Sequence, residues 1–341
     1  VLLNPHVLVV GASGWGKTSL LRRLVRFTWL TGFRGYRVVV FDYLGSFVDL
    51  GLPVIDLSIT PVEPLGLVAS REAGFSSGGP GRRARVFAEA FSVATGLGPL
   101  QLGLVMQATR QAFKAKGIVD GDKGTWAREP PGVEDVVAGL RRVVGRGRFE
   151  EAGKLEARLN ELMLVYESAE KTIGLKKIYR VVREEGSVVL DMHGLDLHTR
   201  IFFTDLIVRR LLDYAQSSKT MLDLMIVVDE AKYAGFLEHR SSEVRPGVEA
   251  ALVARNFGVS VVLSSQGLAH FPGDVLRNIA FKVVGSLTHP VDKEFVSRGM
   301  GGGVGLVVDL LARGRCVIEL VFAGGRVGGL ASRMVFLVEA G

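Results

Sequence analysis

A glycine-rich loop near the start of the chain has residues of the types that bind phosphate. Residues 11–19 read GASGWGKTS and match the pattern G-x-x-x-x-G-K-[ST] at Gly11, Gly16, Lys17 and Thr18. Glycines let backbone N–H groups approach phosphate oxygens, lysine reaches the β- and γ-phosphates of a nucleoside triphosphate, and threonine is a ligand for Mg²⁺. An apolar run precedes the loop and a helical pattern follows it, which would place the phosphates at a helix N-terminus. The alternative is an ordinary glycine-rich turn with an exposed lysine.

Two adjacent carboxylates end another apolar run, LMIVVDEA at 224–231. A strand this apolar does not tolerate unpaired charges, so Asp229 and Glu230 need a positive partner. Beside a phosphate-binding loop, Asp229 would support Mg²⁺ directly or through water, and Glu230 would polarise an attacking water. The alternative, compatible with the first, is that both carboxylates cap the helix that follows.

Two further residues are candidates for the same chemistry. Gln266 follows the apolar run at 260–265 and could orient water or sense a terminal phosphate. Arg255 precedes that run and could reach phosphate bound by a neighbouring subunit. Alternatively, Gln266 is a loop amide that bonds the backbone, and Arg255 is a surface or salt-bridged arginine.

Composition limits the other functions. The six histidines lack close metal-ligand spacing, and the single cysteine, Cys316, excludes both an internal disulfide and a thiolate cluster, so we predict no metal cluster. The segment DMHG at 191–194 has the shape of a GTPase switch, but no guanine-reading N-K-x-D follows. A net charge of +7 favours a polyanionic partner such as nucleic acid or an acidic lipid surface.

The elements that must position these residues follow an α/β pattern. Short runs rich in Val and Ile, without polar alternation, are typical of parallel strands covered by helices on both faces. They lie at 6–11, 37–45, 187–194, 224–231, 260–267 and 281–287. Helical patterns at 19–32 and 199–217 separate some of them. We therefore predict a doubly wound, mostly parallel sheet flanked by helices, closed at one edge by a hairpin of 315–321 and 332–340.

The stretch 71–182 interrupts this rhythm, because it has helical spacing but no comparable strand run. We predict a loop at 74–85 and an inserted all-helical subdomain with helices near 84–95, 99–116, 133–144 and 150–168. Residues 1–70 and 183–341 would then form the core domain. Leucines at helical spacing in 150–174 either pack inside the insertion or contact a partner.

Taken in order, these segments resemble the HerA–FtsK superfamily of hexameric translocating ATPases, particularly its HerA-like, conjugation-type and archaeal DNA-import members. The resemblance covers nearly the whole chain and is carried by the segments GASGWGKTSL (11–20), VVVFDYLGSF (38–47), PVEPLGL (61–67), MIVVDEAKYAG (225–235), ARNFGVSVVLSSQGLAHFP (254–272) and LLARGRCVIEL (310–320). It implies a RecA-like P-loop fold and ATP hydrolysis. HerA-like members often have a basic residue before the first strand, where this chain reads Asn4-Pro5-His6, so a second trans-acting cation stays unassigned.

The resemblance also implies a role for each site residue. Lys17 would hold phosphate, Thr18 and Asp229 would hold Mg²⁺, Glu230 would be the general base, Gln266 the sensing glutamine, and Arg255 the arginine that acts across the subunit boundary. The residues expected to bind ATP are Ala12, Ser13, Gly14, Trp15, Gly16, Lys17, Thr18 and Ser19.

The function implied is an ATP-driven DNA motor working as a homo-oligomeric ring, with loops 232–247 and 81–85 as candidate contacts to DNA. The alternatives are a secretion or pilus-assembly ATPase that moves protein, and an ATP-dependent switch without steady turnover. No run is long and apolar enough to cross a bilayer, so we expect a cytoplasmic location. The chain begins with Val1, and we expect a longer protein whose missing part could contact a membrane channel.

Overall fold

The computed structural model describes residues 4–67, 78–144, 149–218, 221–236, 244–269, 271–300, 304, 307–308, 311, 315–322 and 332–339. Within this part of the chain, nine strands form one sheet in the order β3-β4-β2-β5-β6-β1-β7-β8-β9. Strands β1 to β7 are parallel, whereas β8 and β9 are antiparallel and close one edge as a hairpin. The predicted fold class and hairpin are confirmed.

The strands coincide closely with the apolar runs of the sequence. They are β1 (Val7–Val10), β2 (Arg37–Asp42), β3 (Val54–Asp56), β4 (Ser187–Asp191), β5 (Leu224–Val228), β6 (Val259–Ser265), β7 (Phe281–Val284), β8 (Arg315–Phe322) and β9 (Ser332–Glu339). Strand β3 is short and half-exposed, and its sequence lacks the apolar run that marks the others.

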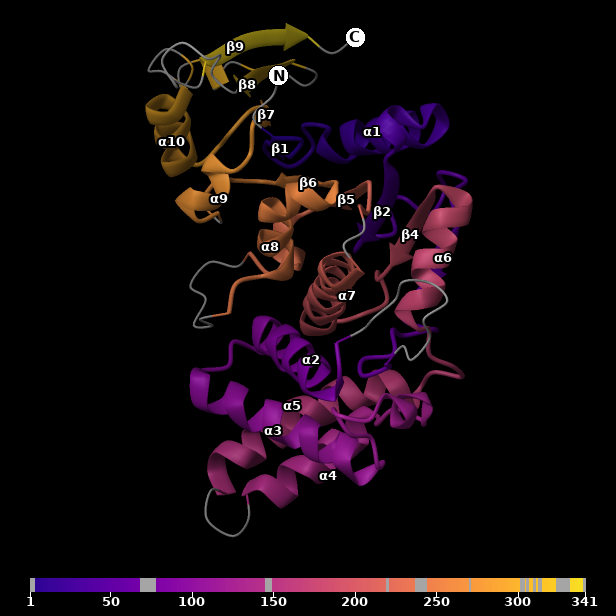
Figure 1. The fold of residues 1–341 in the computed structure, drawn as a ribbon. Coiled ribbons are helices and arrows are strands. Elements are labelled where there is room, and N and C mark those ends of the chain that lie inside the picture. The colour runs from indigo at the N-terminus through magenta and orange to yellow at the C-terminus, as the bar shows by residue number, and fades with distance from the viewer. Residues whose placement is uncertain are drawn as a thin grey trace.

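Alternate residues of each strand pack into two separate clusters, one on each face of the sheet. Val38 and Val40 lie on the face of the sheet that α1 (Lys17–Thr31) covers. Val39 and Phe41 lie on the opposite face, which α7 (Leu197–Ser218) and α8 (Gly247–Val253) cover. Figure 1 shows α1 on one side of the sheet and α7 and α8 on the other.

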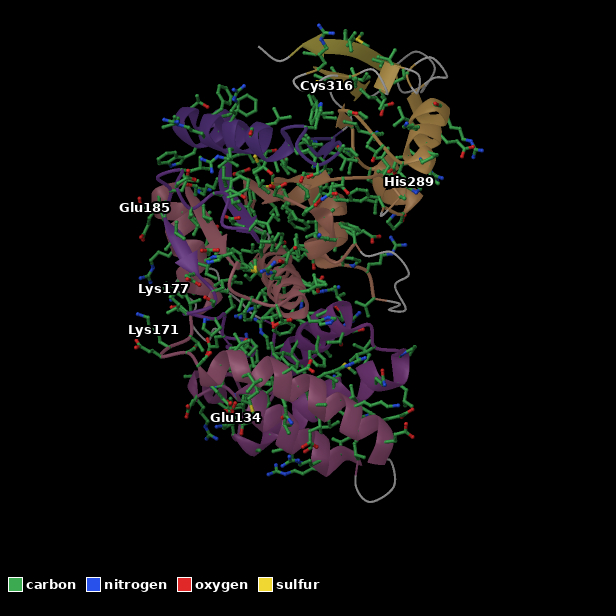
Figure 2. All side chains as sticks on the ribbon, turned by 180° about the vertical axis from the view of Figure 1, so that it is seen from behind. Glu134, Lys171, Lys177, Glu185, His289 and Cys316 are labelled. Atoms are coloured by element: carbon green, nitrogen blue, oxygen red, sulfur yellow. The ribbon has the colours of Figure 1, made fainter. Side chains whose placement is uncertain are left out.

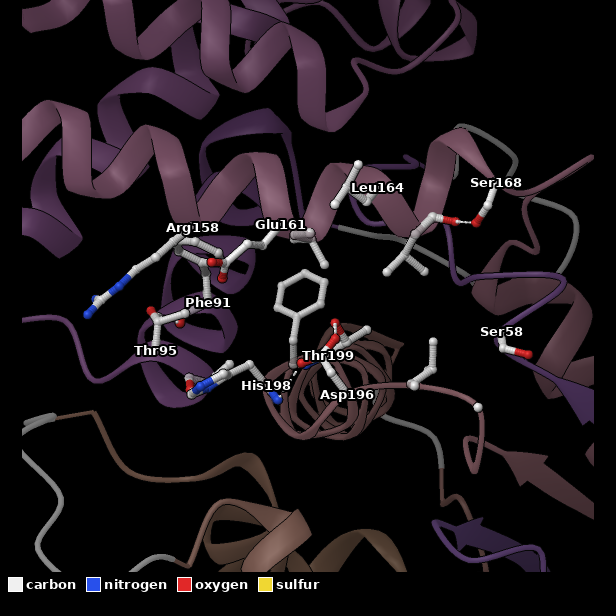
Figure 3. Close-up of a pocket in the computed structure, with 16 residues that line it drawn as sticks. Ser58, Phe91, Thr95, Arg158, Glu161, Leu164, Ser168, Asp196, His198 and Thr199 are labelled. Atoms are coloured by element: carbon white, nitrogen blue, oxygen red, sulfur yellow. Dashed lines mark hydrogen bonds between the residues drawn. The ribbon is translucent and has the colours of Figure 1, made fainter.

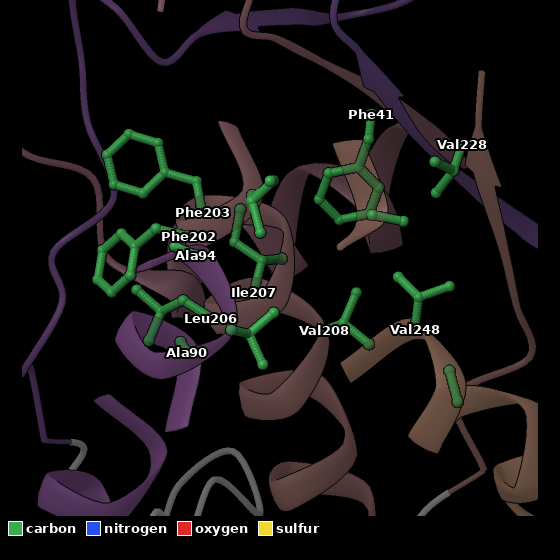
Figure 4. Packing of buried hydrophobic residues seen from close by; sticks show 14 of the residues in the cluster. Phe41, Ala90, Ala94, Phe202, Phe203, Leu206, Ile207, Val208, Val228 and Val248 are labelled. Atoms are coloured by element: carbon green, nitrogen blue, oxygen red, sulfur yellow. The ribbon is translucent and has the colours of Figure 1, made fainter. Parts of the chain in front are cut away.

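Helix α7 is the centre of the larger cluster. Its Phe202, Phe203 and Leu206 are all 1% exposed or less, and Figure 4 shows this helix between the sheet and α2 (Pro80–Thr95). A helix that is apolar around most of its circumference is stable only when neighbours cover it on several sides. Helix α7 therefore joins the sheet to the helices beyond it.

The segment predicted to be a helical insertion lies mostly at the end of the molecule farthest from α1 (Figure 1). It contains α2, α3 (Pro99–Ala115), α4 (Val133–Val144) and α5 (Phe149–Glu167). The buried leucines of α5, Leu155, Leu159 and Leu162, pack internally, as the first of the two interpretations predicts. Charged side chains such as Glu134 and Lys171 lie on the outside (Figure 2).

Two local predictions need correction. The segment 80–85 is the first part of α2 rather than a loop, because Pro80 fits the first helical turn and Gly79 precedes it. Helix α6 (Leu175–Glu185), which the sequence analysis did not predict, contacts β4 and β2. It therefore packs on the sheet, although its residues 175–182 belong to the segment predicted as the insertion.

The remaining helices, α9 (Gly273–Arg277) and α10 (Pro290–Met300), flank β7 in the sequence. None of the helices described has the length and apolarity needed to cross a membrane.

Candidate nucleotide-binding site

Three neighbouring strands bring the predicted site residues together. Strands β5, β6 and β1 are adjacent and parallel, so their carboxyl ends meet at one edge of the sheet. Asp229 and Glu230 follow β5, Gln266 follows β6, and the glycine-rich loop follows β1. Ligands of open α/β sheets bind at such an edge, beyond the carboxyl ends of the strands.

The glycine-rich loop turns directly into α1. Gly14 and Gly16 have φ values of 76° and 113°, which other residues adopt only with strain. The start of the loop is fixed by backbone bonds to its neighbours: Gly11 N–H donates to the Ser265 carbonyl at 3.2 Å, and Ala12 N–H donates to the Ser286 carbonyl at 2.7 Å. Helix α1 starts at Lys17, so its unpaired N–H groups face the loop.

Lys17 lies over the loop. Its ammonium Nζ donates to the carbonyls of Gly11 at 2.7 Å and Ala12 at 3.1 Å. Burial lowers the pKa of Lys17, while the charges of Glu230 and Asp229 act in the opposite direction. The two carboxylates therefore favour the charged form of Lys17 and offset part of the cost of burying it.

Thr18 and Asp229 form the predicted metal-binding pair. Thr18 Oγ1 donates to Asp229 Oδ2 at 2.6 Å. A hydroxyl and a carboxylate fit Mg²⁺, which is held in nucleotide sites by one or two protein oxygens together with substrate phosphates and water. Among the described residues, no group of three or more His, Cys, Asp or Glu could hold a metal ion without such help.

Ser264, which the sequence analysis did not select, connects the two carboxylate residues. Its hydroxyl donates to Asp229 Oδ1 and accepts from Glu230 N–H at 3.0 Å, and its side chain is fully buried on β6. The sequence signal for Ser264 is a polar residue near the end of an otherwise apolar strand that neighbours the strand ending in Asp229 and Glu230.

Glu230 has an unusual backbone. Its φ of 76° and ψ of 91° are strained for a residue with a side chain, and such outliers persist where the surroundings enforce them. Gln266 Nε2 donates to Glu230 Oε2 at 2.7 Å. The predicted base and the predicted sensing glutamine therefore lie in direct contact.

These residues line one pocket of about 300 Å³. Its lining comprises Ser13, Gly14, Gly16, Lys17, Thr18, Ser19, Leu44, Asp229, Glu230 and Gln266. Leu44 enters from the β2 end, where Asp42 accepts bonds from Leu44, Ser46 and Phe47 N–H at 3.3, 2.9 and 2.7 Å. The sequence predicts a strand at 37–45 but no role for it in the pocket.

Two members of the predicted ATP-binding set, Ala12 and Trp15, do not line the pocket. Trp15 points elsewhere. Its indole Nε1 donates to the carbonyl of Arg315 on β8 at 3.0 Å, and its ring packs against Gly285. The side chain thus anchors the loop to the sheet edge rather than lining the pocket.

Arg255 lies in the short helix η5 (Ala254–Phe257), but its side chain is outside the described part of the structure. Of the loop 232–247, residues 237–243 also lie outside it.

A second pocket of about 540 Å³ lies away from this site, between α5 and the start of α7. Figure 3 shows Phe91, Leu164 and His198 around it. It contains none of the predicted site residues.

Solved structures share this fold. The structure of VirB4 from Thermoanaerobacter pseudethanolicus has a TM-score of 0.62 and 16% identity, over 98% of this chain and 89% of that one. The chain has the VirB4 fold. The plasmid coupling protein TrwB in complex with the ATP analogue ADPNP has a TM-score of 0.59 and 18% identity, over 99% and 86%. An unbound form of TrwB gives 0.51 and 17%, over 97% and 76%.

These likenesses bear out the predicted fold class. No protein-family model matches the chain, and the comparison with curated proteins found no match. The nucleotide site described above therefore rests on its own geometry.

Proposed function

We propose that this protein hydrolyses ATP and uses the free energy to move DNA. The observation that carries the ATPase proposal is the contact network around the loop. Thr18 bonds to Asp229, Ser264 joins Asp229 to Glu230, and Gln266 holds the Glu230 carboxylate. This arrangement supplies phosphate binding, metal support and a base within one pocket.

The chemistry follows from the positions of these groups. Phosphates at the loop would accept bonds from backbone N–H groups and from Lys17, whose present bonds to two loop carbonyls are exchangeable. Mg²⁺ at Thr18 and Asp229 would neutralise charge on the β- and γ-phosphates. The Glu230 carboxylate would accept a proton from a water molecule while the oxygen of that water attacks the γ-phosphorus. This step releases ADP and phosphate.

Gln266 has a positioning role in this proposal. Its amide donates to Glu230 and lies at the end of the strand beside the loop, so it can respond both to the base and to a terminal phosphate. An amide that orients the attacking water is a recurrent part of such sites.

We further propose that ATP is bound between subunits of a ring, with Arg255 of one subunit reaching the phosphate held by the next. The support is the position of Arg255 in η5, directly before β6, together with the implied membership of a hexameric superfamily. Such a ring would work inside the cell, free or docked on a membrane channel.

DNA is the proposed cargo because the chain carries a net charge of +7 and shares its fold with a plasmid coupling protein. The domain division is likewise a proposal: a core of 1–70 and 183–341 and an insertion of 71–182, to which α6 makes an exception by packing on β4 and β2.

The test is the rate of ATP hydrolysis with and without duplex DNA, on protein whose assembly state has been measured by light scattering. The proposal predicts Mg²⁺-dependent turnover that DNA stimulates. If the rate of ATP hydrolysis does not change when DNA is added, the result would instead support a motor that moves protein. Tight ATP binding without turnover would support a switch. Lys17→Ala is the control, because it removes the phosphate-binding ammonium.

A further inference from the structure

A groove far from the nucleotide pocket has arginines along its rim. It measures about 940 Å³ and lies between α2, α3 and α7. Arg82 and Arg85 enter from α2, Arg110 from α3 and Arg209 from α7. The floor is apolar and includes Val86, Leu102 and Met106.

Two of these arginines are exposed and pair with carboxylates that are more deeply buried. The Arg82 side chain is 45% exposed and pairs with Asp213, which is 6% exposed. Arg85 is 71% exposed and donates through Nε to Glu89, 18% exposed, at 2.7 Å. The buried carboxylates therefore hold the guanidinium groups in place. The solvent-exposed side of each pair is the cationic one.

Arg85 and Arg110 keep most of their N–H donors available. Each guanidinium has five N–H donors, of which the pair with Glu89 uses one on Arg85. Arg110 is exposed, and no hydrogen bond or ion pair of its side chain is found among the described residues. The four arginines outnumber the two carboxylates of the lining, Glu89 and Asp213.

The helix bearing this cluster adds to its positive potential. The first turn of α2 contains Arg82 and Arg83 but no acidic residue, so cations lie at the positive end of the helix dipole. The Asp120 carboxylate, which accepts from Gly81 N–H at 2.8 Å, offsets part of this charge at the start of the helix.

Arg209 connects the groove to the segment that follows the catalytic candidate Glu230. Its side chain is 13% exposed, and all three of its nitrogens donate: Nε to Asp205, Nη1 to Glu89 at 2.6 Å, and Nη2 to the carbonyl of Arg245. Arg245 is itself 72% exposed and bonds to Glu249 at 3.0 Å. Because Glu89 also accepts from Arg85, Glu89 and Arg209 together link the two segments expected to contact DNA, 81–85 and 232–247.

We propose that this arginine groove, defined by the exposed Arg82, Arg85 and Arg110, binds the phosphate backbone of duplex DNA. The proposal deepens the proposed function and rests on it for the identity of the cargo. Arginine forks match phosphate oxygens, and contacts of this kind hold a duplex without selecting its sequence. None of the described lining residues is aromatic, so the groove lacks the stacking platform that single strands use.

The test is fluorescence anisotropy of a labelled duplex, without nucleotide, over a series of salt concentrations. The double variant Arg85→Gln with Arg110→Gln removes two phosphate contacts. The slope of log K against log salt should fall by about 2, and affinity at about 0.1 M salt should fall roughly 60-fold. The matched control is Arg141→Gln, because Arg141 is also an exposed arginine, 66%, paired with a glutamate.

The outcomes separate this inference from the ATPase proposal. ATP turnover without DNA should be unchanged in the double variant, since neither arginine touches the nucleotide pocket. A double variant that binds duplex with the slope of the wild type overturns the inference, even if the ATPase is active. Selective loss of binding to polyglutamate, with duplex binding intact, also overturns it and assigns the groove to an acidic protein segment.

Discussion

Ser264 ties Asp229 to the backbone of Glu230, so one hydroxyl orients both carboxylate residues. We predict that Ser264→Ala raises the Mg²⁺ concentration needed for half-maximal ATP turnover and lowers turnover about 10- to 100-fold, because the partners of metal-supporting groups contribute effects of this size. A Mg²⁺ titration of the ATPase rate measures both.

The matched control is Ser265→Ala. Ser265 is equally buried on β6, but its hydroxyl accepts from Gly267 N–H at 3.3 Å and touches neither carboxylate residue. If Ser264→Ala and Ser265→Ala show the same Mg²⁺ dependence, Ser264 has no positioning role.

At the scale of residues, sequence predicts the groups whose chemistry is local in the chain. Residues 13, 14 and 16–19 of the loop line one pocket with Asp229, Glu230 and Gln266, as their positions at strand ends predict. Trp15 and Ser264 could not be assigned in this way. Their roles depend on Arg315 and Asp229, which are 300 and 35 residues away in the chain.

At the scale of elements, the phosphate-binding loop is braced against β7 and β8 by Trp15. A Cβ atom at Gly285 would lie 2.2 Å from the Trp15 ring, so Gly285→Ala must displace the indole and with it the loop. We predict a loss of about 1–3 kcal/mol in the free energy of unfolding and weaker ATP binding, measured by urea denaturation and calorimetric titration.

Gly153→Ala is the control for this substitution. Gly153 lies inside α5, where a Cβ meets nothing within 4 Å, so alanine should stabilise the protein by about 0.5–1 kcal/mol and leave ATP binding unchanged. Equal effects of the two substitutions would contradict the bracing role of Trp15.

The start of α7 gives a pH-dependent prediction. Asp196 accepts from His198 N–H at 2.8 Å and Thr199 N–H at 3.0 Å. Burial would raise the pKa of Asp196, but the bonds from Thr199 and His198 outweigh it and leave the pKa below its usual value. The ionised cap therefore stabilises the fold above the unfolded-state pKa of about 3.9 and is lost as pH falls through the lower folded-state value.

Asp196→Ala should accordingly cost about 1 kcal/mol of unfolding free energy at neutral pH, the usual loss for an N-cap. The difference from the wild type should shrink at pH values below the folded-state pKa. Urea denaturation across pH measures it, and a cost independent of pH would show that the charge of Asp196 does not contribute.

Elements were predictable where the apolar pattern is strong. Strands β1, β2 and β4 to β9 and helices α1 to α5 and α7 follow their predicted ranges, because Val-rich runs and helical spacing decide them locally. Strand β3 and helix α6 form because β4 offers an edge and a face to pack against. The segment 80–85 was misassigned because its glycines and arginines outweighed Pro80, which suits a first helical turn.

At the scale of the whole molecule, the proposal of a shared site between subunits can be tested by mixing inactive variants. Glu230→Gln lacks the base and Arg255→Ala lacks the trans-acting cation, so each alone should be inactive. In a ring with head-to-tail interfaces, random mixing in equal amounts restores both groups at about one quarter of the sites. Activity of the mixture measures this, and a mixture as inactive as its parts would contradict a site shared between subunits.

ATP turnover by Glu230→Gln at saturating Mg²⁺ and ATP tests most directly whether Glu230 is the base for ATP hydrolysis in this pocket. Glutamine keeps the oxygen that accepts the bond from Gln266 but cannot take a proton from water, so the pocket should bind ATP as the wild type does. Turnover should be at least about 100-fold slower, with ATP binding retained. Turnover at the wild-type rate would contradict this role of Glu230.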